Sequence, residues 1–145
     1  MNAKIINWID KQKPKLVRAA EEYLSQNEIY RAIGSKKAIS ISQLQNLLNA
    51  ARSGSTLAEL RNFLRYQMGR GTKGTRGWTE WDSGEALIRL LDEQVGQRAE
   101  KAPPAKANQE GAPKTVRYDV ESKLAALLLG YIVRHFTFME ALSKK

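Results

Sequence analysis

The chain has 145 residues, of which 42% are apolar and 27% are charged, a composition that suits one packed globular domain. It contains no cysteine and a single histidine, which excludes disulfides, cysteine-based metal sites and paired-histidine acid–base catalysis. The 24 basic residues outnumber the 15 acidic ones, and the net charge of +9 favours a polyanionic partner.

Apolar residues at helical spacing begin at the N-terminus. Residues 1–13 carry isoleucines near one face, and Pro14 is expected to stop or restart this helix because proline lacks the backbone N–H. Two further helices, residues 40–53 and 56–68, each begin with a capping-box pattern, Ser40 with Gln43 and Thr56 with Glu59. Their three-residue linker predicts a tight antiparallel or angled hairpin.

The second half of the chain alternates irregular and helical segments. Residues 69–83 are rich in glycine and basic side chains and predict a loop, after which a helix restarts at Asp82. Residues 99–115 hold three of the four prolines and almost no large apolar side chain, so we expect a flexible tether. A strongly apolar helix follows in residues 116–145, which we expect to pack back on the bundle.

These patterns predict an all-α fold, a compact bundle of about five helices forming one domain over residues 1–145. Residues 35–98 are expected to supply its basic hairpin, loop and following helix. The longest apolar run, Leu124 to Val133, has about half of the ~20 residues needed to cross a bilayer. It therefore predicts a buried core helix in a cytoplasmic protein with no membrane partner.

Positive charge is concentrated in residues 29–79, which contain nine basic side chains and one acid, Glu59. Such segregation favours contact with nucleic-acid phosphates, although a solvated flank or loop is the alternative. Trp78 and Trp81 follow the basic loop and either stack on unpaired bases or anchor the loop to the bundle. The candidate phosphate contacts are Arg61, Arg65, Arg70, Lys73, Arg76, Lys36, Lys37 and Arg52.

No constellation of residues indicates catalysis. His135 lies between Arg134 and Phe136 in the apolar last helix, where a lone histidine is typical of a core edge. The carboxylate pairs are adjacent or nearly so and lack the spacing of a metal-dependent or acid–base site. We expect neither a metal nor another cofactor, and no enzymatic activity.

Three segments resemble the small helical subunit of type III CRISPR–Cas (Csm-type) effector complexes. Residues 39–48 are similar to the helix that opens the family's hairpin, residues 57–70 to its basic second helix, and residues 136–142 to its closing helix. The resemblance implies a non-catalytic subunit that stacks in several copies and contacts guide and target RNA beside other effector subunits in antiviral defence. Arg61, Arg65 and Arg70 match basic positions of that family segment.

Other classes remain open from the sequence. A helix-turn-helix DNA-binding regulator would use residues 40–53 and 56–68, but the start of its recognition helix reads Leu57-Ala58-Glu59-Leu60 instead of polar base readers. A metal-dependent ribonuclease would need scattered carboxylates as ligands. A purely structural bundle that binds no nucleic acid is the third alternative.

Overall fold

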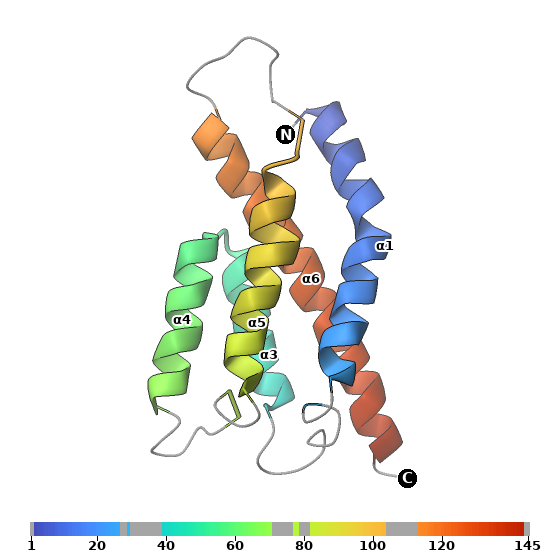
Figure 1. The fold of residues 1–145 in the computed structure, drawn as a ribbon, viewed down its shortest axis with the longest axis vertical. Helices are drawn as coiled ribbons and strands as arrows, with labels where there is room; N and C mark the ends of the chain where they lie inside the picture. Colours follow the sequence, from blue (N-terminus) through green and yellow to red (C-terminus); the bar gives the residue numbers. More distant parts are fainter. Residues whose placement is uncertain are drawn as a thin grey trace.

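The computed structural model describes residues 2–26, 29, 39–70, 77–78, 82–103 and 113–143. These residues form five helices and no strand, which confirms the predicted all-α bundle (Figure 1). The helices are α1 (Ala3–Ser25), α3 (Ile41–Arg52), α4 (Leu57–Arg70), α5 (Ser83–Leu91) with its continuation η3 (Asp92–Gln97), and α6 (Pro113–Ser143).

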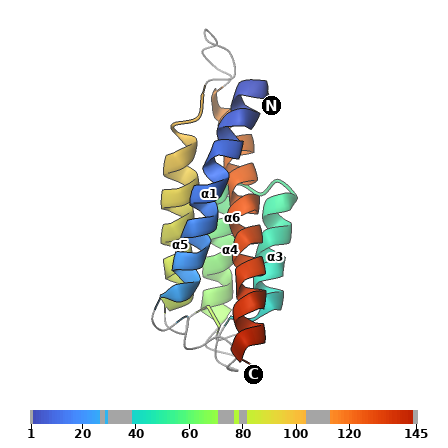
Figure 2. The same cartoon turned by 90° about the vertical axis from the view of Figure 1, so that its right-hand side faces the viewer.

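Helix α6 runs the length of the bundle, with α1 packed along one side and α3 along another (Figures 1 and 2). Helices α3 and α4 run antiparallel, and α5 returns beside α4. All five helices contribute to one apolar core. Its largest fully buried side chains include Trp78, Tyr23, Phe136, Ile5, Leu16 and Leu24.

Helix α1 continues through Pro14, so the predicted break at this residue is wrong. Pro14 cannot donate to the carbonyl of Asp10, a loss that costs about 3 kcal/mol in a helix interior. The helix nevertheless buries Ile5 and Ile9 before the proline and Leu16 after it. Burial of both halves in the bundle core therefore outweighs the local preference for a break.

The hairpin formed by α3 and α4 begins as the capping patterns predict. The Ser40 amide donates to Gln43 Oε1 at 2.8 Å and the Gln43 amide to Ser40 Oγ at 3.2 Å. The corresponding distances between Thr56 and Glu59 are 3.0 and 3.2 Å. The hydrogen bonds from Thr56 hold the pKa of Glu59 below its ordinary value. Gly54 adopts φ +92° in the linker, a conformation that favours glycine.

The helix that follows the basic loop contains a feature that its sequence did not predict. It begins at Ser83, with Asp82 in the left-handed region at φ 54°, and widens into a π-helix at η3. Gly96 lies in this wide turn, where an added Cβ would be 3.1 Å from Leu57 of α4. The close approach of η3 to α4 forms one wall of the pocket described below.

The structure describes both ends of residues 99–115, the segment that was predicted to be a tether, and finds helical structure at each end. Ala99 is buried at the end of the preceding helix, and α6 begins at Pro113, a residue well suited to a first helical position. Residues 104–112, for which the sequence predicted flexibility, lie outside the described part of the chain. Length and composition would let Arg117–Ser143 of α6 span a membrane, a property that core helices of soluble bundles share.

Candidate nucleic-acid interface

The outer face of α4 presents two of the predicted arginines to solvent. The helix buries Leu57, Leu60 and Leu64 against the bundle, and this leaves Arg65 and Arg70 exposed on the other side. Tyr66 lies beside them with 59% of its surface accessible, and the Arg70 guanidinium lies 5.6 Å from the centre of its ring. This contact is within the range of a cation–π interaction.

Neither exposed arginine is neutralised by the described part of the protein. No carboxylate among these residues lies within ion-pair distance of Arg65 or Arg70. Glu59, the acid of the same helix, lies six residues before Arg65 and eleven before Arg70, and its carboxylate accepts a hydrogen bond from the Thr56 amide. The exposed end of α4 therefore combines positive charge with an aromatic surface, and we call Arg65, Tyr66 and Arg70 the α4 face.

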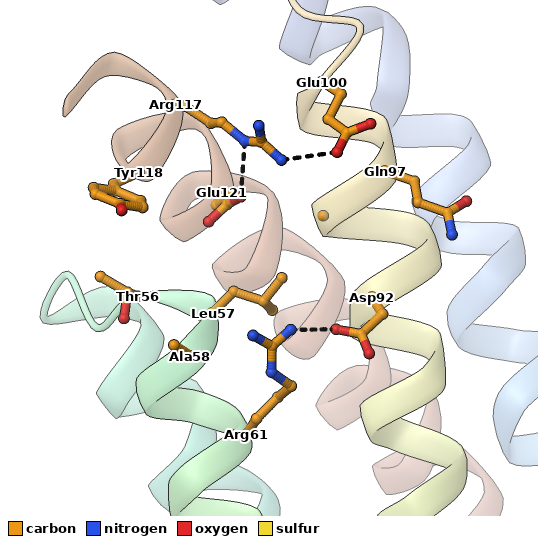
Figure 3. A pocket seen from close by; sticks show the side chains of 11 residues that line it. Thr56, Leu57, Ala58, Arg61, Asp92, Gln97, Glu100, Arg117, Tyr118 and Glu121 are labelled. Carbon is orange, nitrogen blue, oxygen red and sulfur yellow. Dashed lines mark hydrogen bonds and ion pairs between the residues drawn. The ribbon is translucent and has the colours of Figure 1, made fainter. Parts of the chain in front are cut away.

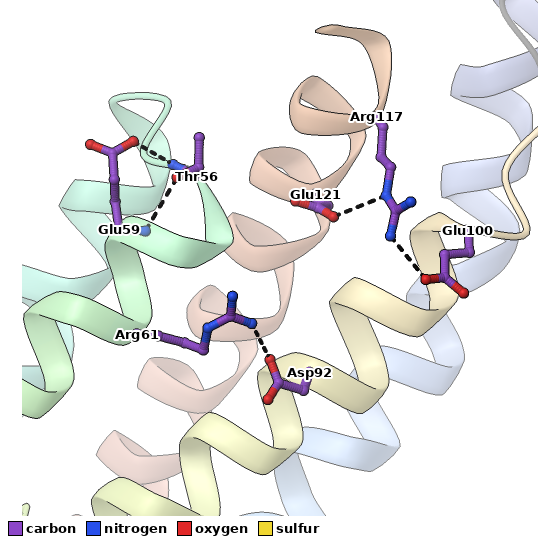
Figure 4. Close-up of polar contacts among 7 residues, drawn as sticks. All are labelled: Thr56, Glu59, Arg61, Asp92, Glu100, Arg117 and Glu121. Carbon is purple, nitrogen blue, oxygen red and sulfur yellow. Dashed lines mark hydrogen bonds and ion pairs between the residues drawn. The ribbon is translucent and has the colours of Figure 1, made fainter. Parts of the chain in front are cut away.

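Arg61, the third arginine of this helix, points elsewhere. Its Nη1 lies 2.5 Å from Asp92 Oδ1 of η3, and 32% of its side chain is exposed (Figure 4). The sequence placed Arg61 with Arg65 because they are four residues apart in a segment almost free of acids. Its counter-ion comes from residue 92, beyond that segment, so a count of charges along the chain could not reveal the pairing.

Of the remaining predicted contacts, Arg52 is the one that the structure describes, and it does not cluster with the α4 face. Arg52 is exposed at the end of α3, beside the start of α4, so the length of α4, about 20 Å, separates it from Arg70 (Figure 1). Lys36, Lys37, Lys73, Arg76 and Trp81 lie outside the described residues.

Trp78 is fully buried, and of its two expected roles this placement fits the loop anchor. Its carbonyl oxygen accepts a hydrogen bond from the Gly84 amide at 2.8 Å, and the neighbouring Gly77 carbonyl accepts one from Ser83 Oγ at 2.7 Å. The Tyr23 hydroxyl donates to the Ser83 carbonyl at 2.7 Å, and burial raises the pKa of Tyr23 well above its ordinary value. These bonds fasten the end of the loop and the start of α5 to α1.

A pocket of about 660 Å³ separates the start of α4 from η3 and from the first turns of α6 (Figure 3). The Arg61–Asp92 pair lies on one side of this pocket. On another, Arg117 Nη2 lies 3.0 Å from Glu100 Oε1 and its Nε 3.3 Å from Glu121 Oε1 (Figure 4). Three carboxylates and two guanidinium groups thus line the pocket, which makes it a poor site for a phosphate chain.

The sequence interpretation missed this ion-pair group. The four-residue spacing of Arg117 and Glu121 was a visible signal, typical of a pair on one helix face. Glu100 was assigned to the tether and its pairing across the gap could not be foreseen. The ion pair between Glu100 and Arg117 joins the end of the helix that contains η3 to the first turns of α6.

The described residues contain no group of three or more histidine, cysteine, aspartate or glutamate side chains placed to hold a metal ion. His135 is half-buried, and its ring centre lies 6.0 Å from that of Phe138. What this part of the chain provides is an arginine-rich surface and two polar pockets, the second of which is described below.

No family model, curated protein or solved structure matches the chain.

Proposed function

We propose that this protein binds RNA through phosphate contacts made by the α4 face. The observation that carries the proposal is a pair of exposed arginines on either side of an exposed tyrosine, for which the described residues provide no carboxylate partner. Guanidinium groups bind phosphate oxygens in a bidentate manner and stay charged at every physiological pH. An accessible aromatic ring beside them offers a stacking surface for an unpaired base.

The two arginines offer two separate phosphate contacts. They are five residues apart, which is about 7.5 Å along the helix axis and about 140° beyond one full turn, so their side chains leave different sides of the helix end. Contacts of this kind give affinity that depends strongly on salt and little on base sequence.

We further propose that the chain acts as the non-catalytic small subunit of a type III CRISPR–Cas ribonucleoprotein. In that role several copies would associate along the complex and contact guide and target RNA, beside other effector subunits. The support is the resemblance of residues 39–48, 57–70 and 136–142 to that family, together with the α4 face. Self-association and the other subunits are parts of the same proposal.

The test is fluorescence anisotropy of labelled single-stranded RNA, guide–target RNA duplex and double-stranded DNA at two salt concentrations. We expect Arg65→Ala with Arg70→Ala to weaken RNA binding, and the control Arg18→Ala with Arg134→Ala to leave it nearly unchanged. Arg18 and Arg134 are also exposed arginines, one in α1 and one in α6. Equal losses in both variants would refute the assignment of the α4 face, and tighter binding to double-stranded DNA than to RNA would favour a DNA-binding regulator.

A further inference from the structure

A second pocket, of about 260 Å³, lies between α1 and the helix that contains η3. Trp8, Gln12 and Lys15 line it from α1, and Gln97, Arg98 and Lys101 from the opposite side. Gln97 also lines the first pocket, so the two pockets adjoin the same helix. The second pocket is distinct from the α4 face in both its elements and its residues.

The guanidinium of Arg98 is fixed in this pocket by neutral acceptors. Its Nε donates to the Gln94 carbonyl at 3.1 Å, its Nη1 to Gln12 Oε1 at 2.8 Å and its Nη2 to Gln94 Oε1 at 2.5 Å. The Gln12 side chain is itself buried, with 8% of the residue exposed, and its Nε2 donates to the Trp8 carbonyl at 3.1 Å. Three of the five N–H groups of Arg98 are thus occupied, which leaves one on each terminal nitrogen for a bidentate ligand.

The charge of Arg98 has no counter-ion in the described part of the protein. Arg61 and Arg117 both pair with carboxylates, whereas no carboxylate there lies within ion-pair distance of Arg98. Burial lowers the pKa of Arg98 from its ordinary value, so the charged form is held at a cost. A half-buried cation with neutral partners is stabilised when an anion occupies the adjoining pocket.

The other charged residues of the pocket define the kind of anion. Lys15 and Lys101 are exposed at its edge, and Glu93 is the acid that lines it. The pocket therefore carries a local charge of about +2, which a doubly charged phosphate group balances and a single carboxylate does not. Its volume leaves room for a phosphate group together with part of the compound or nucleic acid that carries it.

We propose that the pocket between α1 and η3 binds a phosphate group, with Arg98 as the bidentate ligand and Lys15 and Lys101 as flanking charges. The phosphate belongs either to a small phosphorylated compound or to a nucleic-acid backbone, since both present the same oxygens. The site does not depend on RNA binding by the α4 face.

The experiment is a titration of the full chain with sodium phosphate at constant ionic strength, followed by the NMR signals of the Trp8 indole N–H and the Arg98 Nε–H. We expect both signals to shift and to reach saturation. Lys15→Gln with Lys101→Gln should weaken binding at least about fivefold, because each lysine adds a unit charge close to the anion. The control Lys123→Gln with Arg134→Gln removes two exposed charges of α6 and should bind phosphate as the natural chain does.

Shifts that do not saturate, or that are the same in the pocket and control variants, would overturn the proposal. A short single-stranded RNA identifies the source of the phosphate. If the Trp8 and Arg98 signals show that RNA displaces phosphate from the pocket, the pocket holds a backbone phosphate. If phosphate still saturates these signals in the presence of RNA, the pocket binds a small phosphorylated compound.

Discussion

Replacing Gly84 with alanine should destabilise the fold by overpacking the junction of α4, α5 and Trp78. The added Cβ would lie 2.8 Å from Met68 Sδ and 2.9 Å from the Trp78 carbonyl oxygen. The methionine side chain can rotate away, but the carbonyl is held because it accepts the Gly84 amide at 2.8 Å. Overpacking of this kind costs about 1–3 kcal/mol. For a chain of this size, the melting temperature should fall by roughly 3–10 °C.

Urea denaturation followed by far-UV circular dichroism measures this loss. Gly130 of α6 is the matched control, because an added Cβ there has no atom within 4 Å. Gly130→Ala should stabilise the chain by up to about 1 kcal/mol, since alanine is the better helix former. If Gly84→Ala were as stable as the natural chain while Gly130→Ala behaved as expected, the tight packing of Gly84 against Trp78 would be refuted.

Three other predictions concern the polar contacts of the hairpin. Arg61→Ala should change RNA affinity far less than Arg65→Ala in anisotropy titrations, and a larger effect from Arg61 would contradict its pairing with Asp92. In urea denaturation, Arg61→Ala should lower the free energy of unfolding by under ~1 kcal/mol, because the Arg61–Asp92 pair is partly exposed. Thr56→Ala should lower the free energy of unfolding by about 1 kcal/mol through loss of the cap. Folding lowers the pKa of Glu59, so its charged carboxylate stabilises the fold at pH values above its unfolded pKa. This stabilisation should disappear as the pH falls through the folded pKa. The melting temperatures of the natural chain and of Glu59→Gln should therefore differ near neutral pH and converge in acid.

The parts of the fold that were predicted correctly are those that local chemistry determines. Ser40 with Gln43 and Thr56 with Glu59 mark helix starts by reciprocal hydrogen bonds within four residues, and the structure contains all of these bonds. The apolar composition of residues 116–145 likewise predicted a helix that packs on the bundle, and α6 buries Leu124, Leu128 and Ile132 in the core. Contacts between residues this close in the sequence can be predicted without knowing which helices pack together.

The features that were missed depend on residues far apart in the chain. Pro14 remains inside α1 because residues on both sides of it are buried in the bundle core. Arg61 lies apart from the α4 face because it pairs with Asp92, 31 residues later. Arg98 gains its constrained position from Gln12, which is 86 residues away. Spacing rules describe one helix at a time and cannot identify such partners.

The central claim, that the α4 face binds RNA phosphates, is tested most directly by the salt dependence of RNA affinity. The slope of log affinity against log salt for single-stranded RNA reports about 0.7 per neutralised phosphate. Removing Arg65 and Arg70 together should therefore reduce the slope by about 1.4, whereas removing Arg18 and Arg134 should leave it unchanged. A slope that is the same in the natural chain and in the Arg65→Ala, Arg70→Ala variant would contradict the account.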